Sequence, residues 1–417
     1  MKKKLPDRWD NIFHLWSNGY LKTLPDSVSN KISHKKAHGK LVLILKDFLA
    51  DFLRLFKTTN IPKNKICFIV FTKNNVDALN NIKQNVPDSI YLTFFRFRSK
   101  LNIRTHYYYL PLTFFYDLIF PINWLRYYFF NKKKALKYYD LLFSINGTYE
   151  ESLKFLKKSR PKALVFSNDH LVISRAMLLA AKRLGIKTYY VQHASTSCYF
   201  PPLEFTYSLL EGEDAFYKYK KCGPINSEVY LVGMPKFDFY SENINQKLSL
   251  DTIGVAYNLT DRIDHTQEFL LQLRNNNPDI MIFARPHPAD ERALPSIENI
   301  KISNPKNENS FEFLKQIDCL ISGESSIHLE AVLLNVYPCY FNFGNSNERF
   351  DYYSYIKNGL VENFKNFEQL NEKIQELKNF KPNIQHRGKY YNASLGKNFY
   401  GKSSLKSAEI ILTTVEK

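Results

Sequence analysis

Short apolar runs alternate with amphipathic stretches along most of the chain. From residue 65 onward, apolar runs that are rich in β-branched and aromatic side chains predict buried strands. In the first half they occupy residues 65–72, 140–145, 163–169, 187–194, 206–213 and 227–235. The stretches between them include helical patterns at 75–86, 151–159 and 170–186. Strands that alternate with helices in this way are typical of βαβ units and predict a parallel sheet.

The same pattern restarts after a polar segment. Gly233 and Pro235 interrupt the chain, and we expect a linker at about 237–250. The second half then has strand patterns at 252–260, 279–288, 318–325 and 336–343 and helical patterns at 265–277, 310–316 and 326–335. The sequence therefore predicts an α/β protein with two doubly wound, Rossmann-like domains, residues 1–240 and 250–417, which face each other across a cleft. The last helix either stays with the second domain or returns to the first.

Two prolines flank a histidine at the end of one predicted strand of the second half. In the stretch ARPHPAD, Pro286 and Pro288 hold the backbone extended around His287, and Arg285 precedes them. Two nitrogen-bearing side chains held in fixed places suit an anion or a nucleotide. We therefore expect Arg285, His287 and Pro288 to contribute to a nucleotide-binding site. The alternative is that the prolines only end the strand.

The stretch SGESSIHLEA, residues 322–331, follows another predicted strand. Ser325 or Ser326 caps the helix that begins there, so free backbone N–H groups and the positive end of the helix dipole predict an anion site. Gly323 and Glu324 form the turn, and Glu330 lies about one turn inside the helix, on the face able to reach a ribose. An ordinary capped helix is the alternative.

Polar residues also end three predicted strands of the first half. His193 follows Gln192 at one strand end, where a neutral imidazole can serve as a general base or as a donor to a phosphate. Glu211 ends another, where a partly desolvated carboxylate can take a proton from a sugar hydroxyl. Asp169 and His170 end the third, where either orients the other or a ligand hydroxyl. The alternative is that these residues only terminate strands or start helices.

The net charge of +18 indicates an anionic partner, because 58 basic residues outnumber 40 acidic ones. Nucleic acid, an anionic membrane surface and anionic small substrates are the candidates. The chain has no helix-turn-helix, zinc-finger or RNP-like pattern, which argues against nucleic acid. Its five cysteines lack metal-ligand spacing, so we expect neither a metal site nor a disulfide framework, and a cytoplasmic location. A secretory signal is not expected, since no unbroken apolar segment follows the basic start.

An aromatic and basic block spans residues 94–139 and would form an insertion in the first domain. Prolines and polar residues interrupt it too often for it to span a bilayer. Mixed aromatic and basic side chains are typical of the membrane interface, so we expect peripheral, salt-sensitive contact with anionic lipid at the inner face of the cytoplasmic membrane. The side chains expected there are Tyr107, Tyr108, Tyr109, Phe114, Phe115, Trp124, Arg126, Phe129, Lys132, Lys133 and Lys134. A buried pair of aromatic helices with a solvated lysine tail is the alternative.

The motifs QHA, VGMPKFD, RPHP and SGESSIHLEA, placed in two α/β halves, resemble those of the GT-B glycosyltransferases. They are most similar to bacterial capsule and lipopolysaccharide enzymes, including sialyl-, polysialyl- and Kdo-transferases. Bacterial sialyltransferases share an acid-acid-glycine motif, an HP motif and a serine motif. His287-Pro288 and Ser325-Ser326 match the last two, whereas Glu211-Gly212 supplies only one of the two acids. The resemblance covers roughly residues 160–345.

This resemblance implies a metal-independent transferase that needs no cofactor and moves a sugar onto a growing, often lipid-linked, surface glycan. It implies a CMP-linked nonulosonic acid of the sialic, pseudaminic or Kdo type as donor, with Glu211 as general base and His287 and the serines at the nucleotide and its phosphate. QHA also resembles the CDP-glycerol glycerophosphotransferases, which implies His193 as the base. A UDP-sugar or CDP-glycerol donor stays open, as does a non-catalytic basic protein that binds nucleic acid or membrane.

Overall fold

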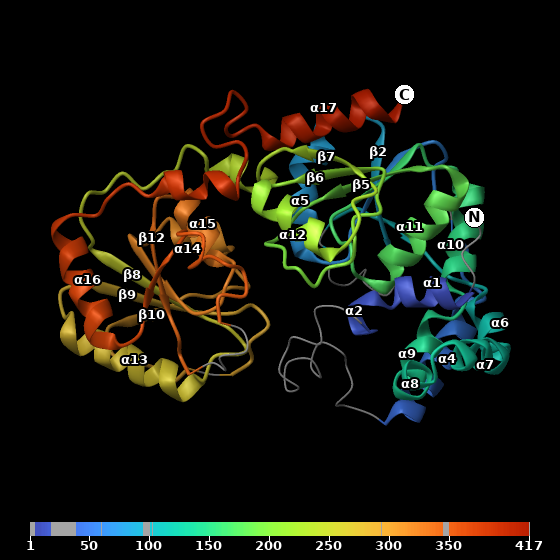
Figure 1. Cartoon of the computed structure of the whole chain (residues 1–417), viewed down its shortest axis with the longest axis horizontal. Coiled ribbons are helices and arrows are strands. Elements are labelled where there is room, and N and C mark those ends of the chain that lie inside the picture. The colour runs from blue at the N-terminus through green and yellow to red at the C-terminus, as the bar shows by residue number, and fades with distance from the viewer. Residues whose placement is uncertain are drawn as a thin grey trace. The chain divides into compact units, whose positions relative to one another are not determined.

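The computed structural model describes residues 5–17, 39–59, 61–94, 101, 103–292, 294–344 and 350–416. The chain divides into two compact units, each of which contains one sheet (Figure 1). Unit 1 comprises residues 1–211, 215–236 and 404–417, and unit 2 comprises residues 212–214 and 237–403.

The sheet of unit 1 has the strand order β3-β2-β1-β4-β5-β6-β7, and every neighbouring pair is parallel. Its strands are β1 (Ile66–Ile69), β2 (Ser89–Phe94), β3 (His106–Tyr108), β4 (Ala163–Phe166), β5 (Lys187–Val191), β6 (Tyr207–Leu210) and β7 (Glu228–Leu231). Starting in the middle and running outward in both directions is the doubly wound, Rossmann-like order. The predicted strand at 140–145 is wrong: this run forms helix α9 (Tyr139–Ile145), because its apolar side chains pack on other helices.

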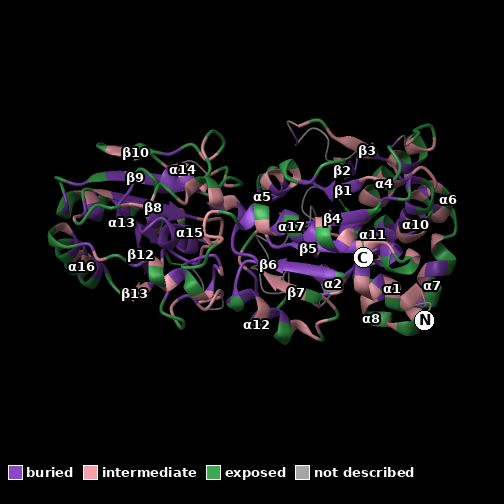
Figure 2. Cartoon of the chain, turned by 90° about the horizontal axis from the view of Figure 1, so that it is seen from above, coloured by how far each residue is buried: buried purple, intermediate pink, exposed green. Residues whose placement is uncertain are grey.

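Helices cover both faces of this sheet. On one face, α5 (Lys73–Gln84) and the C-terminal helix α17 (Ser403–Val415) pack on the strands. On the other face, α10 (Thr148–Ser159), α11 (Val172–Leu184) and α12 (Glu213–Cys222) close the core. The Tyr189 hydroxyl lies 2.7 Å from the Thr414 hydroxyl, which fixes α17 to β5. The strands at the centre of both sheets are accordingly buried (Figure 2).

A group of helices from the first 145 residues packs at one side of unit 1 (Figure 1). It contains α1 (Leu5–Ile12), α2 (His14–Ser17), α4 (Lys40–Arg54), α6 (Thr113–Leu118), α7 (Phe120–Phe130), α8 (Lys132–Lys137) and α9. The buried guanidinium of Arg175 on α11 holds α1, donating to Asn11 Oδ1 at 2.7 Å and to Glu204 Oε2 at 2.9 Å. No helix among the described residues is long and apolar enough to cross a bilayer.

One side chain expected at a membrane surface lies in the core instead. Tyr108 belongs to the edge strand β3 and is buried, with its hydroxyl 2.9 Å from the hydroxyl of Ser152. Its placement follows from strand alternation, which turns it toward α10. The expected interfacial role of Tyr108 is therefore wrong, and residues 95–100 and 102 of the same block lie outside the described residues.

The sheet of unit 2 repeats the topology of unit 1, with the order β10-β9-β8-β11-β12-β13 and parallel neighbours. Its strands are β8 (Thr252–Tyr257), β9 (Met281–Pro286), β10 (Ile300–Ile302), β11 (Cys319–Ser322), β12 (Tyr337–Phe341) and β13 (Glu362–Phe364). Its helices are α13 (Ile263–Asn276), α14 (Ser310–Leu314), α15 (Ile327–Leu333) and α16 (Phe367–Asn379), with short 3₁₀ helices η3 (Pro235–Tyr240) and η5 (Gln385–Tyr390). The four strands predicted in this half are confirmed.

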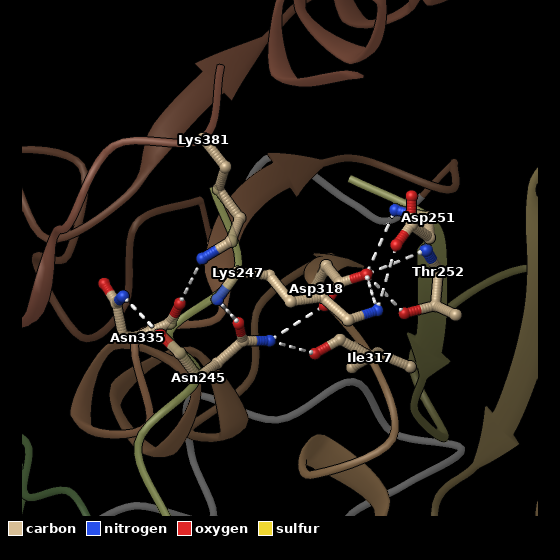
Figure 3. A network of polar contacts seen from close by, with 8 residues as sticks. All are labelled: Asn245, Lys247, Asp251, Thr252, Ile317, Asp318, Asn335 and Lys381. Carbon is tan, nitrogen blue, oxygen red and sulfur yellow. Dashed lines mark hydrogen bonds and ion pairs between the residues drawn. The ribbon is translucent and has the colours of Figure 1, made fainter. Parts of the chain in front are cut away.

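A buried carboxylate ties the start of this sheet to the segment that precedes it (Figure 3). Asp318 Oδ2 accepts hydrogen bonds from the backbone N–H groups of Asp251 and Thr252, both at 3.0 Å, and from the Thr252 hydroxyl at 2.8 Å. Asn245 Nδ2 donates to Oδ1 at 2.9 Å, and the Lys247 ammonium lies 3.2 Å from Oδ2. Burial alone would raise the pKa of Asp318, but these donors keep it below its usual value.

We expect Asp318→Asn to lower the free energy of unfolding of unit 2 by about 3 kcal/mol, because an amide group would face several buried N–H donors. Asp251→Asn is the matched control, since the Asp251 side chain is 64 % exposed and should contribute less than about 1 kcal/mol. Urea denaturation followed by far-UV circular dichroism measures both variants. All three tryptophans belong to unit 1, so their fluorescence transition should not move.

The effect of Asp318→Asn should also depend on pH. Because the folded pKa is lowered, the ionised carboxylate stabilises the protein above the unfolded pKa of about 4, and this contribution disappears as the pH falls through the folded value. The difference between wild type and variant should therefore shrink below about pH 4. Equal losses in the Asp318 and Asp251 variants would contradict the account.

Candidate functional site

In unit 2 the predicted nucleotide-binding motifs follow β9 and β11, the two strands that flank β8. The strand order reverses between β8 and β11, and ligands of doubly wound sheets bind at the carboxyl ends of strands at this point. Asn258, which follows β8, donates from Nδ2 to the Glu324 carbonyl at 2.9 Å. A Cβ atom on Gly323 would lie 3.2 Å from Asp261 Oδ1, so this position favours glycine. The loops after β8 and β11 therefore meet at the carboxyl ends of these strands, which we call the carboxyl edge of the sheet.

His287 is exposed just beyond β9, and the structure defines its tautomer. Its Nδ1 accepts a hydrogen bond from the Ala289 N–H at 3.1 Å, so the ring proton of the neutral form is on Nε2. Desolvation lowers the pKa of His287 and outweighs the opposite effect of the Asp290 carboxylate. At neutral pH the side chain thus offers one N–H donor to a ligand oxygen.

Arg285 is placed differently from His287, although only one residue separates them. It is buried, and its Nη1 donates to the Ser303 hydroxyl at 2.7 Å while Nη2 donates to the Glu308 carbonyl at 3.1 Å. The Glu308 carboxylate lies 3.5 Å away, and Phe313 lies under the guanidinium. These contacts orient Arg285 toward β10 and α14, so its expected contact with a phosphate stays a prediction.

Ser325 and Ser326 of SGESS are half-buried at the start of α15, whereas Ser322 is buried in β11. Ser325 Oγ accepts a hydrogen bond from the Ile327 N–H at 3.4 Å, whereas Ser326 makes no capping bond through its side chain. Glu324 is buried, and its carboxylate accepts from the Tyr340 hydroxyl at 3.2 Å and from the Tyr353 N–H at 3.1 Å. Pro288 is exposed beside His287, and Glu330 is buried on α15.

Two positioning features of this edge were not predicted. His328 is fully buried, and its Nε2 lies 3.2 Å and 3.0 Å from the carbonyl oxygens of Ser322 and Gly323, which fixes the turn after β11. Burial lowers its pKa to about 4, so it is neutral in the folded protein. A buried histidine that bonds only to backbone leaves no mark in the sequence beyond its position on an apolar helix.

Arg292 is the second positioning feature. Its guanidinium forms a bidentate pair with the Asp290 carboxylate, at 2.8 and 2.6 Å. It also donates to the carbonyl oxygens of Asp261 at 2.7 Å and Asn258 at 2.8 Å. The loop after β9 is thereby bonded to the loop after β8. The sequence shows an acid at 290 and a base at 292, but not the bonds of Arg292 to the backbone of the other loop.

In unit 1, Asp169 and His170 form a hydrogen-bonded pair after β4. The buried carboxylate of Asp169 lies 2.8 Å from His170 Nδ1 through Oδ1 and accepts from the Tyr219 hydroxyl at 2.6 Å through Oδ2. Burial would raise the pKa of Asp169, but its hydrogen bonds and the neighbouring charges keep it below its usual value. An ionised Asp169 therefore holds the proton of His170 on Nδ1 and leaves Nε2 as an acceptor, and Asn168 Nδ2 lies 3.3 Å from this atom.

The residues after β5 and β6 are joined by a second pair of hydrogen bonds. Gln192 Nε2 donates to Glu211 Oε2 at 3.2 Å, and the Glu211 N–H donates to Gln192 Oε1 at 2.8 Å. Glu211 is buried. His193 is half-buried, and burial followed by the charge of His170 lowers its pKa to about 4. The Nδ1 atom of His193 has no hydrogen-bond partner within the described part of the chain.

The two units thus carry different chemistry at the carboxyl ends of their strands. Unit 2 offers neutral donors, namely His287 Nε2–H and two serine hydroxyls, and unit 1 offers proton acceptors. Within the ranges that the structure describes, no group of three or more His, Cys, Asp or Glu side chains is arranged to hold a metal ion.

No protein-family model and no curated protein matches the sequence. Solved structures do resemble the fold. A UDP-GlcNAc 2-epimerase from Neisseria meningitidis bound to UDP-GlcNAc has a TM-score of 0.56 at 12 % identity, with 84 % of this chain and 99 % of that chain covered. The S. aureus MnaA–UDP structure has a TM-score of 0.52 at 11 % identity, covering 85 % of this chain and 96 % of that chain.

The wall teichoic acid polymerase TagF is also similar. A histidine-to-asparagine variant soaked with CDPG has a TM-score of 0.53 at 14 % identity, with 93 % of this chain and 96 % of that chain covered. At this level of identity the similarity shows the fold alone. Together with the repeated strand order, it shows that the chain has a GT-B-type fold built from two Rossmann-like units, as the sequence predicted.

Proposed function

We propose that this protein is a glycosyltransferase that takes a sugar from a nucleotide-linked donor and needs no metal ion or other cofactor. The observation that carries the proposal is the placement of His287, Ser325 and Ser326 in unit 2. They follow β9 and β11, the strands on either side of β8, where the strand order reverses. Neutral N–H and O–H donors aimed at a leaving phosphate stabilise its charge without a cation. The nucleotides named for the similar structures support a nucleotide at this edge.

The proposed donor is a CMP-linked nonulosonic acid, and the proposed acceptor is a growing capsule or lipopolysaccharide glycan. The support comes from the HP and serine motifs at His287-Pro288 and Ser325-Ser326, which resemble those of the bacterial sialyltransferases. A CDP-glycerol donor is the second candidate, since the fold is also that of a wall teichoic acid polymerase and QHA resembles the glycerophosphotransferases.

For the general base, the geometry favours the Asp169–His170 pair over the two residues expected from the sequence. His170 is half-buried, and the buried carboxylate on Nδ1 orients its ring. An acceptor hydroxyl would take the place of the Asn168 amide that lies 3.3 Å from Nε2. Glu211 is almost inaccessible, and His193 has a pKa of about 4, which makes it a weak base. We therefore propose His170 as the proton acceptor and Asp169 as its positioning residue.

We expect the protein to bind CMP or CDP more tightly than UDP in isothermal titration calorimetry. His287→Ala should weaken this binding about tenfold, and the double variant Ser325→Ala plus Ser326→Ala should weaken it by a similar factor, because charge-assisted contacts to a phosphate are lost. His386→Ala in η5 and Ser310→Ala at the start of α14 are controls that should leave affinity unchanged. Preference for UDP would favour a UDP-sugar enzyme, and wild-type affinity in both site variants would remove the nucleotide from this edge.

We expect His170→Gln to slow nucleotide release from the preferred donor by about 100- to 10,000-fold while nucleotide affinity stays unchanged. Asp169→Asn should also slow it, because the amide no longer fixes the tautomer of His170. Tyr219→Phe removes the other partner of Asp169 and keeps the pair with His170, so it should have little effect. Glu211→Gln and His193→Ala test the alternatives: a larger loss in either variant than in His170→Gln would assign the base there.

A further inference from the structure

Helix α4 exposes its apolar side chains and turns its acidic side chains toward the protein, the reverse of an ordinary surface helix. Its sequence, KLVLILKDFLADFLR, is strongly apolar, yet its one buried side chain is Asp51. A surface helix of a globular protein normally buries its apolar stripe and exposes its charges. Here the inward face carries Asp47 and Asp51, and most of the apolar side chains point away from the described part of unit 1.

The exposed apolar side chains of α4 and its C-terminal end form one continuous stripe. They are Leu41, Val42, Leu45, Leu49, Phe52, Leu53 and Phe56. At about 100° per residue they lie within roughly 120° of the helix circumference. Lys46 and Lys57, both exposed, lie just beyond one margin of this stripe. An apolar stripe with lysines at its margin is the pattern of a helix that lies in a membrane interface.

Helix α6 packs against α4, and α7 follows α6 with further exposed apolar side chains. Phe114 on α6 packs against Phe48 and Phe52 of α4, with ring centroids 5.0 and 5.4 Å apart. The exposed apolar side chains of α6, of α7 and of the residue between them are Phe115, Leu118, Ile119, Ile122, Leu125, Phe129 and Phe130. With Leu136 of α8, fifteen of the twenty-five large hydrophobic side chains exposed in the described residues lie between residues 41 and 136. Such a concentration marks a contact surface rather than the scattered exposure of ordinary surfaces.

The charges around this surface have one sign. The charged side chains exposed on α4, α6, α7 and α8 are Lys46, Arg126, Lys132, Lys133 and Lys137. The carboxylates of these four helices, at positions 47, 51 and 117, are buried or half-buried. Burial, together with the Asp51 carboxylate, raises the pKa of Asp117, which further reduces negative charge here. Two copies of so basic a face would repel each other, whereas anionic lipid would attract it.

We propose that the surface formed by α4, α6, α7 and α8 docks on an anionic lipid bilayer, with α4 and α7 lying in the interface and the exposed lysines and arginine at the headgroups. We call it the α4–α8 face. Its apolar part gives a contribution that persists at high salt, and its basic part gives one that salt screens. This goes beyond the sequence expectation, which rested on the block at 94–139 and did not include α4.

The test is co-sedimentation of the full-length protein with vesicles. One set of vesicles contains phosphatidylcholine with phosphatidylglycerol, and the other contains phosphatidylcholine alone. We expect binding to the anionic vesicles that weakens but persists in high salt. Leu45→Gln plus Leu49→Gln should lower the partition coefficient on the order of tenfold at either salt concentration, because two inserted leucines are lost.

Two further variants separate the contributions. Lys132→Gln plus Lys133→Gln should weaken binding only at low salt. Leu405→Gln is the matched control, since Leu405 lies on α17 and is 50 % exposed, close to the 52 % of Leu49, but lies outside the α4–α8 face. It should bind like the wild type.

The proposal is overturned if the wild type does not sediment with anionic vesicles at low salt, or if Leu405→Gln loses as much binding as the α4 variant. It is also overturned if gel filtration shows a dimer that the α4 variant dissociates while vesicles bind neither form, because the face would then join two copies of the chain. Nucleotide titration of the α4 variant should match the wild type, so failure here is distinguishable from failure of the proposed transferase activity.

Discussion

The proposed chemistry depends on one constraint of parallel sheets: the carboxyl ends of all strands lie along the same side of the sheet. Because the strands run in one direction and are buried on both faces, the polar side chains of both candidate sites lie where the strands end. In unit 2 this places RPHP and SGESS on either side of β8, where the strand order reverses. In unit 1 it places Asp169, His170, His193 and Glu211 after three adjacent strands. At the amino ends of the strands the polar contacts are structural, as in the hydrogen bonds from the Asp251 and Thr252 N–H groups to Asp318.

The loops at the carboxyl ends of the strands are fixed by residues that contact no proposed ligand. Arg292 joins the loops after β8 and β9, His328 fixes the turn after β11, and Asp169 orients His170. Each is a charged or polar group that is buried or half-buried and is hydrogen-bonded to backbone or to a neighbouring side chain, which lowers the cost of keeping it inside a protein. Pre-organised loops of this kind lower the cost of binding a phosphate, since the donors do not have to be ordered by the ligand.

Much of this arrangement was predictable from the sequence, because long apolar runs and helical periodicity define most strands and crossovers. The features that the sequence did not show have physical reasons. The run at 140–145 is short, and only its packing against other helices decides that it is helical. The sequence also does not show which way the Arg285 guanidinium points, because its partners Ser303 and Glu308 lie in the loop after β10. The outward apolar stripe of α4 has the same periodicity as a core-facing one, so the sequence could not show which side would be exposed.

Hydrogen–deuterium exchange with and without CMP, CDP or UDP tests the central claim, that the edge of unit 2 where β8 and β11 end binds a nucleotide. The account predicts that CMP or CDP protects the backbone amides of residues 258–261, 287–290 and 322–327, which belong to the three loops at this edge. Residues 245–252 and 317–319, at the opposite edge of the same sheet, serve as the internal control and should exchange unchanged. Protection at the control segments alone, or in none of the three loops with any of these nucleotides, would contradict it.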